Sequence, residues 1–201
     1  MTAFVITAAY GYLLGSIPFG YILVRVFHGQ DIRQTGSGNI GATNVSRTSP
    51  RLGALTLILD ALKGLAAVVV TRMLFPGQTL MLGTASFFAI VGHMFPVWLR
   101  FRGGKGVATG LGSFVLVAPK TILVMVAIFV VIFVAFRYVS LASILTVALF
   151  PLLAWILEPY RDTPQMLVFL AAASLLIVAK HHENIRRLLA HTESRFQWSR
   201  R

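Results

Sequence analysis

A glycine-rich stretch at residues 35–44 has the residue types of a phosphate-binding loop. Gly36, Gly38 and Gly41 match the spacing G-x-G-x-x-G. Glycines let consecutive backbone N–H groups converge on an anion, and the start of a following helix adds positive potential. As a dinucleotide fingerprint the match is weak, because that motif needs a preceding strand and apolar segments flank this one. The alternative interpretation is a flexible glycine loop with a helix cap.

Side chains within and after this stretch add hydrogen-bonding groups suited to a phosphate. Ser37, Thr43 and Asn44 offer hydroxyl and amide groups. Arg47 follows closely, and its guanidinium offers paired donors that fit phosphate oxygens. The sequence therefore predicts that this segment binds a phosphorylated ligand.

A second glycine-rich segment, which contains Gly103, Gly104, Lys105 and Gly106, combines a loop, a central cation and a helix start. It lacks the Walker A spacing, which argues against an ATP site. The alternative is that the basic residues only orient the chain in the membrane and that the small residues serve helix packing, as in Gly106-x-x-x-Gly110. Two cationic glycine loops in one chain favour anion binding over that alternative.

A third polar motif, Lys-His-His-Glu-Asn at residues 180–184, follows the last apolar segment. His181 has a side chain that positions a phosphate or accepts a proton near neutral pH. Asn184 lies near it, and Glu183 is expected to pair with a local arginine or lysine. No spacing of ligands indicates a metal site.

The elements that position these motifs are apolar helices in a membrane. Hydrophobic residues make up 57% of the 201 residues and charged residues 12%, against about 25% charged in soluble domains. We expect an all-α, polytopic transmembrane bundle with a single membrane-embedded domain over residues 1–201. The net charge of +12 agrees with basic loops that orient the chain in the membrane and with attraction to anionic membrane lipids. Nucleic acid is not an expected partner, because the charges form no basic stripe with interleaved aromatics. The chain has no cysteine, which excludes thiolate chemistry.

The apolar pattern predicts about seven membrane segments. The stretch 107–136 would be about 45 Å long as one helix, against a hydrocarbon core of about 30 Å. It contains Pro119-Lys120, so we divide it there, and 107–118 is then too short for a full span. The expected segments are 3–24, 52–75, 79–99, 107–118, 120–136, 139–157 and 163–180.

The distribution of basic residues predicts an outside N-terminus and a cytoplasmic C-terminus. With seven crossings, only Arg72, Lys120 and Arg161 lie outside, and the remaining basic residues of the loops and tail lie inside. All three polar motifs then face the cytoplasm.

Charged residues also occur within one span. Asp60 and Lys63 are separated by three positions, so they share a helix face and can neutralise each other. Charges in a membrane are costly, and we favour a structural ion pair over a proton path. His93 and Pro96 precede the second glycine loop and shape its entry, and Pro18 should kink the first helix.

Taken in order, these motifs resemble the acyl-phosphate:glycerol-3-phosphate acyltransferase (PlsY) family of bacteria. Each motif alone is weak, but the ordered set covers nearly the whole chain. The segments that carry the resemblance are GSIPFG at 15–20, GSGNIGATNV at 36–45, DALKG at 60–64, GHMFP at 92–96, FRGGKGVATGLG at 101–112, RYVSLAS at 137–143 and KHHEN at 180–184.

The resemblance implies an enzyme that moves a fatty acyl group from acyl phosphate to the 1-hydroxyl of glycerol 3-phosphate. The products are 1-acyl-glycerol 3-phosphate (lysophosphatidic acid) and phosphate, made in bacterial phospholipid synthesis in the cytoplasmic (inner) membrane. An upstream enzyme would produce the acyl phosphate, and no cofactor is required. Both substrates carry a phosphate, which agrees with two cationic glycine loops.

The resemblance also assigns roles to residues. Ser37, Asn39 and Arg47 match the family's first motif, Lys105 with its neighbouring glycines matches the second, and His181 and Asn184 match the third. Glu183 resembles a structural member of the third motif. Ser143 matches a polar site position, with Ser140 as the other candidate. The residues expected at the site are therefore, as catalytic groups, His181, Ser37, Asn184 and Arg47, and, as substrate-binding groups, Gly36, Gly38, Asn39, Gly41, Thr43, Asn44, Gly103, Gly104, Lys105, Gly106 and Ser143.

Acyl phosphate is already activated, so we expect direct attack of the glycerol hydroxyl on the acyl carbonyl, with His181 or a substrate phosphate as the base. No histidine is followed five positions later by aspartate, which argues against the H-x-x-x-x-D apparatus of thioester-dependent acyltransferases. Two alternatives remain: an organic-phosphate transporter, and a non-catalytic scaffold that binds anionic lipid.

Overall fold

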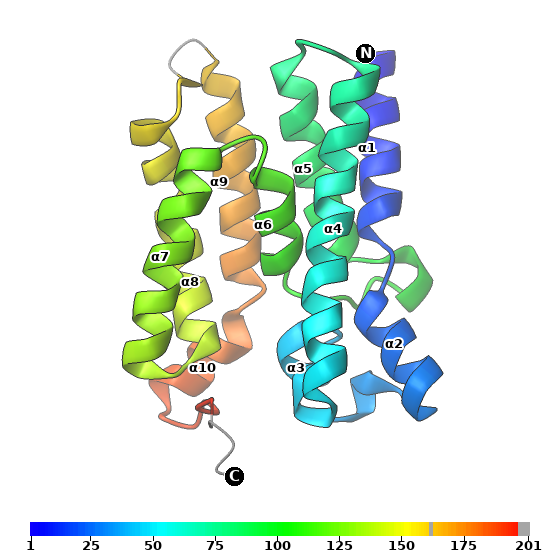
Figure 1. Cartoon of the computed structure of the whole chain (residues 1–201), viewed down its shortest axis with the longest axis vertical. Helices are drawn as coiled ribbons and strands as arrows, with labels where there is room; N and C mark the ends of the chain where they lie inside the picture. Colours follow the sequence, from blue (N-terminus) through cyan, green and yellow to red (C-terminus); the bar gives the residue numbers. More distant parts are fainter. Residues whose placement is uncertain (161–162, 197–201) are drawn as a thin grey trace. The chain divides into compact units, whose positions relative to one another are not determined.

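The computed structural model describes residues 1–160 and 163–196, and within them the chain is helical, with no strand. The expected all-α class is therefore confirmed for this part of the chain (Figure 1). The described residues form two compact units, one within residues 1–117 and the other within residues 118–201. We call them unit 1 and unit 2. The single acyltransferase domain over residues 1–201 stays a prediction.

Unit 1 contains six α-helices and two short 3-10 turns among its described residues. Its elements are α1 (Thr2–Gly15), α2 (Phe19–His28), η1 (Ile32–Gln34), α3 (Ala42–Thr48), α4 (Pro50–Leu74), α5 (Thr79–Met94), η2 (Val97–Leu99) and α6 (Val107–Phe114). Unit 2 contains the remaining helices. They are α7 (Pro119–Phe136), α8 (Val139–Leu157), α9 (Pro164–Ala179) and α10 (His182–Leu189).

Among the described residues, five helical stretches are long and apolar enough to cross a membrane, or six if the bent pair α9 and α10 is one span. In this count α1 and α2 form one stretch, Thr2–His28, and α5 and η2 form another, Thr79–Leu99. The sequence predicted about seven segments, and the difference lies mainly at 107–118. There α6 has eight residues, about 12 Å, which is too short to cross about 30 Å of hydrocarbon by itself. The orientation of the termini stays a prediction, and Arg161, one of the three residues expected outside, is not among the described residues.

The first helix breaks where the proline predicted a kink. Helix α1 ends at Gly15, and Pro18 precedes the first residue of α2. Proline has no N–H to continue the helical ladder, so the carbonyl groups at the break need other partners. The Lys63 Nζ of α4 donates to the Ile17 carbonyl at 2.7 Å. A buried cation from another helix therefore stabilises the broken backbone.

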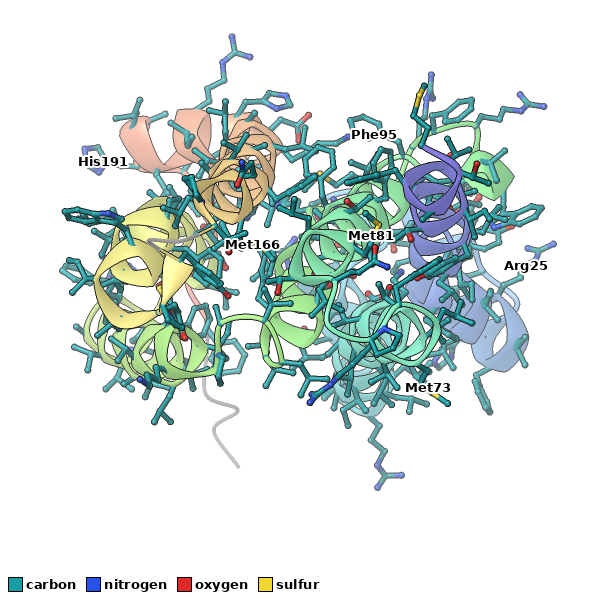
Figure 2. The ribbon with its side chains drawn as sticks, turned by 90° about the horizontal axis from the view of Figure 1, so that it is seen from above. Arg25, Met73, Met81, Phe95, Met166 and His191 are labelled. Carbon is teal, nitrogen blue, oxygen red and sulfur yellow. The ribbon has the colours of Figure 1, made fainter. Side chains whose placement is uncertain are left out.

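Glycines allow the helices of unit 1 to pack closely. A Cβ at Gly15 would overlap the backbone of Ala89 in α5, and one at Gly112 in α6 would overlap the backbone of Ala61 in α4. Small residues at helix contacts are typical of membrane bundles. Figure 2 shows Met81 inside the packed helices of unit 1, where it is buried, whereas the exposed Met73 lies at the periphery.

Unit 2 is built on the α7–α8 hairpin, which turns at Arg137 in the left-handed region with φ +63°. After α10 the chain returns to this turn. The Phe196 N–H donates to the Arg137 carbonyl at 2.7 Å, and Arg195 Nε donates to the Tyr138 hydroxyl at 2.9 Å. We call residues 190–196 the return segment. It brings the last acidic residue of the described chain back onto the start of α8.

Candidate functional site

A small hydrophobic cluster joins the two glycine-rich regions of unit 1. Val24, Ile32, Ile40 and Val45 surround the first glycine loop, and Leu99 of η2 packs with them. All five are buried, with at most 6% of their surface exposed. The residues that flank the first glycine loop and the residue Leu99, which precedes the second, therefore pack together in unit 1.

The first glycine loop is folded around the side chain of Asn44. The Asn44 Oδ1 accepts from the Ser37 N–H at 2.9 Å. Its Nδ2 donates to the carbonyls of Thr35 at 3.0 Å and Asn39 at 2.9 Å, with a longer bond to Ile32 at 3.3 Å. The side chain is buried, and these bonds occupy its amide donors. This geometry favours a scaffold role for Asn44 over the substrate contact expected from the sequence.

Two glycines of this loop are required by its conformation. Gly36 and Gly38 have φ angles of +56° and +69°, in the left-handed region that side chains disfavour. A Cβ at Gly36 would also overlap the Asn44 Oδ1. Gly41 has an ordinary φ, and its N–H donates to the Asn39 Oδ1 at 2.8 Å. Asn39 is therefore partly engaged within the loop as well.

The loop presents its remaining polar groups outward. Ser37, Thr43 and Arg47 are exposed. A Cβ at Gly36 would lie 3.6 Å from the Arg47 Cδ, so the arginine stem passes over that glycine. A hydroxyl-bearing turn below an exposed guanidinium is an arrangement that suits a phosphate.

The second glycine loop packs on the last turn of α5. The N–H groups of Gly103 and Gly104 donate to the carbonyls of Met94 at 3.1 Å and His93 at 3.0 Å. A Cβ at Gly104 would overlap the His93 ring, and one at Gly103 would overlap the His93 carbonyl. These two glycines therefore seat the loop on α5, which is a packing role. Lys105 follows half-buried.

Gly106 ends this loop and begins α6. Its φ is +88°, and its carbonyl accepts from the Gly110 N–H at 2.7 Å. The close contact between α4 and α6 uses Gly64 and Gly112, where an added Cβ would overlap the opposite backbone. Helix packing by small residues thus occurs at Gly64 and Gly112.

A buried group of three ionisable residues lies behind the second loop. Lys63 Nζ is 2.8 Å from Asp60 Oδ1, which confirms the predicted i,i+3 pair. The His93 Nδ1 lies 3.5 Å from the same carboxylate oxygen, and all three side chains are at most 4% exposed. Since Lys63 also donates to Ile17 and Gly104 packs on His93, this group ties the α1–α2 break to the second loop.

In unit 2, His181 is buried at the break between α9 and α10. Its Nδ1 lies 2.8 Å from the Ile177 carbonyl oxygen. A carbonyl only accepts, so Nδ1 carries the proton and a neutral ring presents its lone pair at Nε2. The fold thus fixes the tautomer of a base or hydrogen-bond acceptor at Nε2.

Asn184 lies one turn further on and is held by a carboxylate from the return segment. Its Nδ2 donates to the Glu193 Oε1 at 2.7 Å, the Ser140 hydroxyl donates to the same oxygen at 2.7 Å, and Arg187 Nε donates to Oε2 at 2.6 Å. Burial raises the pKa of Glu193, but the hydrogen bonds from Ser140, Arg187 and Asn184 outweigh it, so the pKa lies below its usual range.

Glu193 organises this motif more tightly than Glu183, whose structural role stays a prediction. Glu183 does pair with a local arginine, Arg187, but the ion pair is long at 3.9 Å and the Glu183 side chain is 66% exposed. The Glu193 side chain is 6% exposed and joins three residues. Sequence reasoning missed it because its partners are far apart in the chain. The sequence did offer one signal. The whole chain has only six acidic residues, so each of them is a candidate for a specific structural or functional role.

Ser140 and Ser143 lie in the first turns of α8, and both are buried. The Ser140 hydroxyl is engaged with Glu193, so it belongs to the scaffold of unit 2. Ser143 stays the candidate for a substrate contact. Among residues 1–160 and 163–196, no group of three or more histidine, aspartate or glutamate side chains forms a metal-ligand set.

These features define a helical membrane protein with two basic glycine loops at one end of unit 1 and a buried histidine beside a held asparagine in unit 2. A family model described as glycerol-3-phosphate acyltransferase matches residues 5–191. The chain belongs to this glycerol-3-phosphate acyltransferase family, which includes PlsY.

Curated relatives and a solved structure agree with this assignment. A glycerol-3-phosphate acyltransferase of Syntrophotalea carbinolica is 43% identical, with 98% of this chain and 100% of the relative covered. One of Agrobacterium fabrum is 49% identical, with 94% and 90% covered. The crystal structure of PlsY, an integral membrane glycerol 3-phosphate acyltransferase in its glycerol 3-phosphate form, is 37% identical, covers 98% of this chain and 96% of its own, and has a TM-score of 0.88.

Proposed function

We propose that this protein transfers a fatty acyl group from acyl phosphate to the 1-hydroxyl of glycerol 3-phosphate. The hydroxyl oxygen bonds to the acyl carbon, the bond from that carbon to the phosphate oxygen breaks, and the hydroxyl proton leaves with a base. The products are lysophosphatidic acid and inorganic phosphate. The family assignment supports this function, as does a second PlsY structure in a lysophosphatidic acid form, 35% identical with a TM-score of 0.86.

The observation that carries the proposal is the pairing of two glycine loops at one end of unit 1. The hydrophobic cluster flanks the first loop on both sides, and its member Leu99 precedes the second loop. Arg47 lies just after the first loop, and Lys105 lies in the second. A reaction between two phosphate-bearing substrates requires like charges to approach, and cations that bridge them lower that cost. We assign the phosphate of glycerol 3-phosphate to the second loop and the polar groups at Ser37 and Arg47 to the first.

His181 is the proposed partner of the glycerol hydroxyl. Its Nδ1 is occupied by the Ile177 carbonyl, so Nε2 is the atom that accepts the proton. A phosphate oxygen of a substrate is the alternative acceptor, with His181 then holding phosphate. Asn184 and Ser143 complete the polar set of unit 2 in this proposal.

Acyl phosphate is a mixed anhydride, so attack on it needs positioning and charge stabilisation more than covalent activation. The mechanism therefore has no acyl-enzyme intermediate and calls for no cofactor. We place the reaction at the cytoplasmic face of the bacterial inner membrane, where an upstream enzyme supplies the acyl phosphate and the lysophosphatidic acid joins the membrane lipids.

The test is acyl transfer by purified protein in detergent. Glycerol 3-phosphate is supplied with palmitoyl phosphate, palmitoyl-CoA or palmitoyl-carrier protein, and lysophosphatidic acid and phosphate are both measured. We expect product from palmitoyl phosphate alone, with one phosphate released per product. Product from a thioester alone would overturn the donor. No product from any donor, with glycerol 3-phosphate flux in liposomes, would favour a transporter.

Two variants test the role of His181. His181→Ala should lose roughly hundredfold or more in turnover, because general base or phosphate-positioning groups contribute that much. His182→Ala is the matched control, since this neighbouring histidine is exposed. Full turnover and an unchanged pH profile in His181→Ala would contradict both proposed roles.

A further inference from the structure

A cationic cavity lies in unit 1 apart from the residues assigned to the reaction. Its volume is about 930 Å³, in the range of pockets that hold a drug-sized ligand. Its walls come from the α1–α2 break, η1, and the η2 segment with the turn that follows it. None of Ser37, Arg47 or Lys105 lines it.

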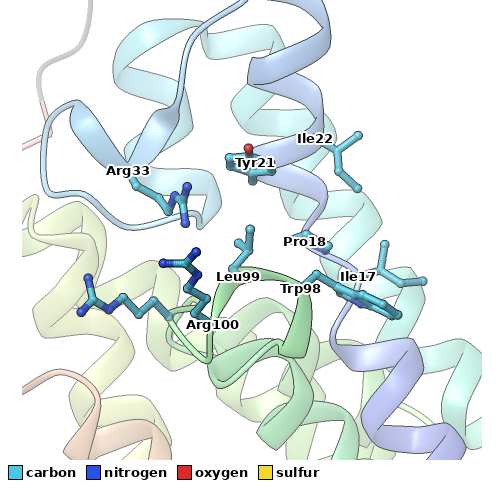
Figure 3. Close-up of a pocket in the computed structure, with 9 residues that line it drawn as sticks. Ile17, Pro18, Tyr21, Ile22, Arg33, Trp98, Leu99 and Arg100 are labelled. Carbon is cyan, nitrogen blue, oxygen red and sulfur yellow. The ribbon is translucent and has the colours of Figure 1, made fainter.

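Three guanidinium groups, those of Arg33, Arg100 and Arg102, line this cavity. Figure 3 shows Arg33 and Arg100 facing the same space from two different segments. The guanidinium groups of Arg100 and Arg102 have no hydrogen bond or ion pair to another residue in the described part of the chain, and both residues are exposed. Two cations are therefore available to an anion.

The third arginine, Arg33, is held in place by Asp31, which neutralises its charge. Asp31 accepts from its Nε at 2.9 Å and from its Nη2 at 2.6 Å, and the guanidinium lies 5.0 Å from the centre of the Tyr21 ring. The hydrogen bond from Arg33 keeps the pKa of Asp31 below its usual range, so Asp31 stays charged at neutral pH. The three arginines and Asp31 thus sum to a net charge of about +2, which matches a phosphate monoester.

The turn that carries Arg100 is itself unusual. Arg100 and Phe101 have φ angles of +52° and +62°. Two consecutive side chains in the left-handed region cost about 1–2 kcal/mol each. The turn is held by the Phe101 N–H, which donates to the Pro96 carbonyl at 3.0 Å. A strained, fixed turn therefore aims a guanidinium at the cavity.

The opposite wall of the cavity consists of aliphatic side chains and a tryptophan. Ile17, Ile22 and Leu99 contribute aliphatic surface, and Trp98 is 63% exposed beside them. Figure 3 shows Trp98 next to Ile17, on the side away from Arg33. Tryptophan is typical of the membrane–water interface, so this wall suits an alkyl chain that enters from the lipid. A ligand that satisfies both walls carries a phosphate at one end and a chain at the other.

We propose that this cavity binds the phosphate head group of a membrane amphiphile, with Arg100 and Arg102 on the phosphate and Ile17, Ile22 and Trp98 along its chain. The preferred occupant is a single-chain phosphate monoester, a choice that rests on the proposed function because its lipid donor and lipid product are single-chain phosphates. An anionic bilayer lipid such as phosphatidylglycerol also carries a phosphate, but as a diester with a single negative charge.

The test measures binding without turnover, so it is independent of the proposed reaction. Trp98 is one of three tryptophans, and Trp155→Phe with Trp198→Phe leaves it as the only one. Hexadecyl phosphate, which has no acyl group to transfer, is titrated into this protein in an uncharged detergent. We expect a saturable change in Trp98 fluorescence, and inorganic phosphate at the same concentration should cause none.

Variants then connect the binding to the arginines. In the same background, Arg100→Gln with Arg102→Gln should weaken hexadecyl phosphate binding at least tenfold, and each single change should have a smaller effect. Arg72→Gln, an exposed arginine outside the cavity, is the matched control and should stay within twofold. Both single variants are measured too, so the test survives if the double variant does not fold.

Competition identifies the source of the head group. Displacement by lysophosphatidic acid, without displacement by phosphatidylglycerol, supports a site for the single-chain phosphates of the reaction. Displacement by both supports the same cavity as a site for anionic bilayer lipid. Unchanged binding in the single and double arginine variants, or equal binding of inorganic phosphate, would overturn the proposal.

Discussion

The first glycine loop and the motif around His181 are each organised by one buried side chain, but the two side chains differ in chemistry. Asn44 holds its loop with a neutral amide whose partners are backbone groups. Glu193 holds its motif with a carboxylate whose partners are the side chains of Ser140, Asn184 and Arg187. Neither organising residue is exposed to solvent to any large extent.

The difference teaches how each region responds to change. An amide that bonds backbone groups fixes the path of the chain, so its loss should alter every group the loop presents. A carboxylate that bonds side chains fixes their rotamers while the helices beneath remain. Loss of Asn44 should therefore disrupt the whole first loop, and the effect should not depend on pH. Loss of the Glu193 charge should disturb the motif around His181 only in part, and this contribution of Glu193 should be lost in acid.

The largest expected effect is from Asn44→Ala. This change removes the hydrogen bonds to the Ser37 N–H and to the carbonyls of Thr35 and Asn39, and each such bond contributes about 0.5–1.5 kcal/mol. We expect acyl transfer to fall roughly hundredfold or more because the loop loses its geometry. Thr43→Ala is the control, since its side chain is exposed. Equal activity in both variants would refute the scaffold role of Asn44.

A second prediction tests the same loop without removing the amide. Gly36→Ala adds a Cβ that overlaps the Asn44 Oδ1 at a φ of +56°. We expect roughly a thirtyfold loss of acyl transfer, because the loop must shift away from its position. Gly29→Ala is matched in backbone strain, with a φ of +67°, but its Cβ would meet nothing within 4 Å. If both variants lost the same activity, backbone strain rather than the Asn44 contact would be the cause.

A smaller effect is expected from Glu193→Gln. The new amide oxygen still accepts from Ser140 and Asn184, but the charge opposite Arg187 is lost. A hydrogen bond to a charged group contributes about 1.5–3 kcal/mol, so a loss of roughly tenfold in acyl transfer is expected. Glu183→Gln should be nearly neutral, because that carboxylate is 66% exposed. The reverse ranking would return the structural role to Glu183.

The smallest expected effect is in the pH dependence of stability. The folded-state pKa of Glu193 is lowered, so its stabilising contribution is present above the unfolded-state pKa and is lost as the pH falls through the folded-state value. The difference in melting temperature between the parent and Glu193→Gln should therefore be constant from pH 7 to about 5 and shrink in stronger acid. The difference between the parent and Asn44→Ala should not change over this range.

An acid titration of this kind would sharpen the contrast between the two regions. If the Asn44→Ala difference also shrank in acid, a titrating group would have to hold the first loop. Thermal unfolding of the three proteins in one detergent, across one set of buffers, provides the measurement.

Local spacing explains what could be predicted from the sequence. Asp60 and Lys63 lie three residues apart on a helix, so their pairing follows from helical geometry alone. Pro18 lacks an N–H, so a break in the first helix follows from its chemistry. The apolar runs predicted membrane helices because their length and hydropathy are also local properties of the chain. The exception is α6, which proved too short to count as a span.

Long-range contacts explain what could not be predicted. His93 joins the Asp60–Lys63 pair from a different helix, and Glu193 reaches Ser140 across 53 positions of sequence. Asn44 resembled a substrate-binding residue because an amide suits a phosphate as well as it suits a backbone carbonyl. Residue type alone does not distinguish these partners.

The sequence by itself thus determined the membrane environment, the helical class and the family, because hydropathy, helix spacing and ordered motifs are properties of the chain. Only the tertiary structure decided which polar residues hold the two motifs and which face outward. That choice depends on where the return segment and the first loop come to lie. A buried polar group must find a partner, and the fold determines which one is within reach.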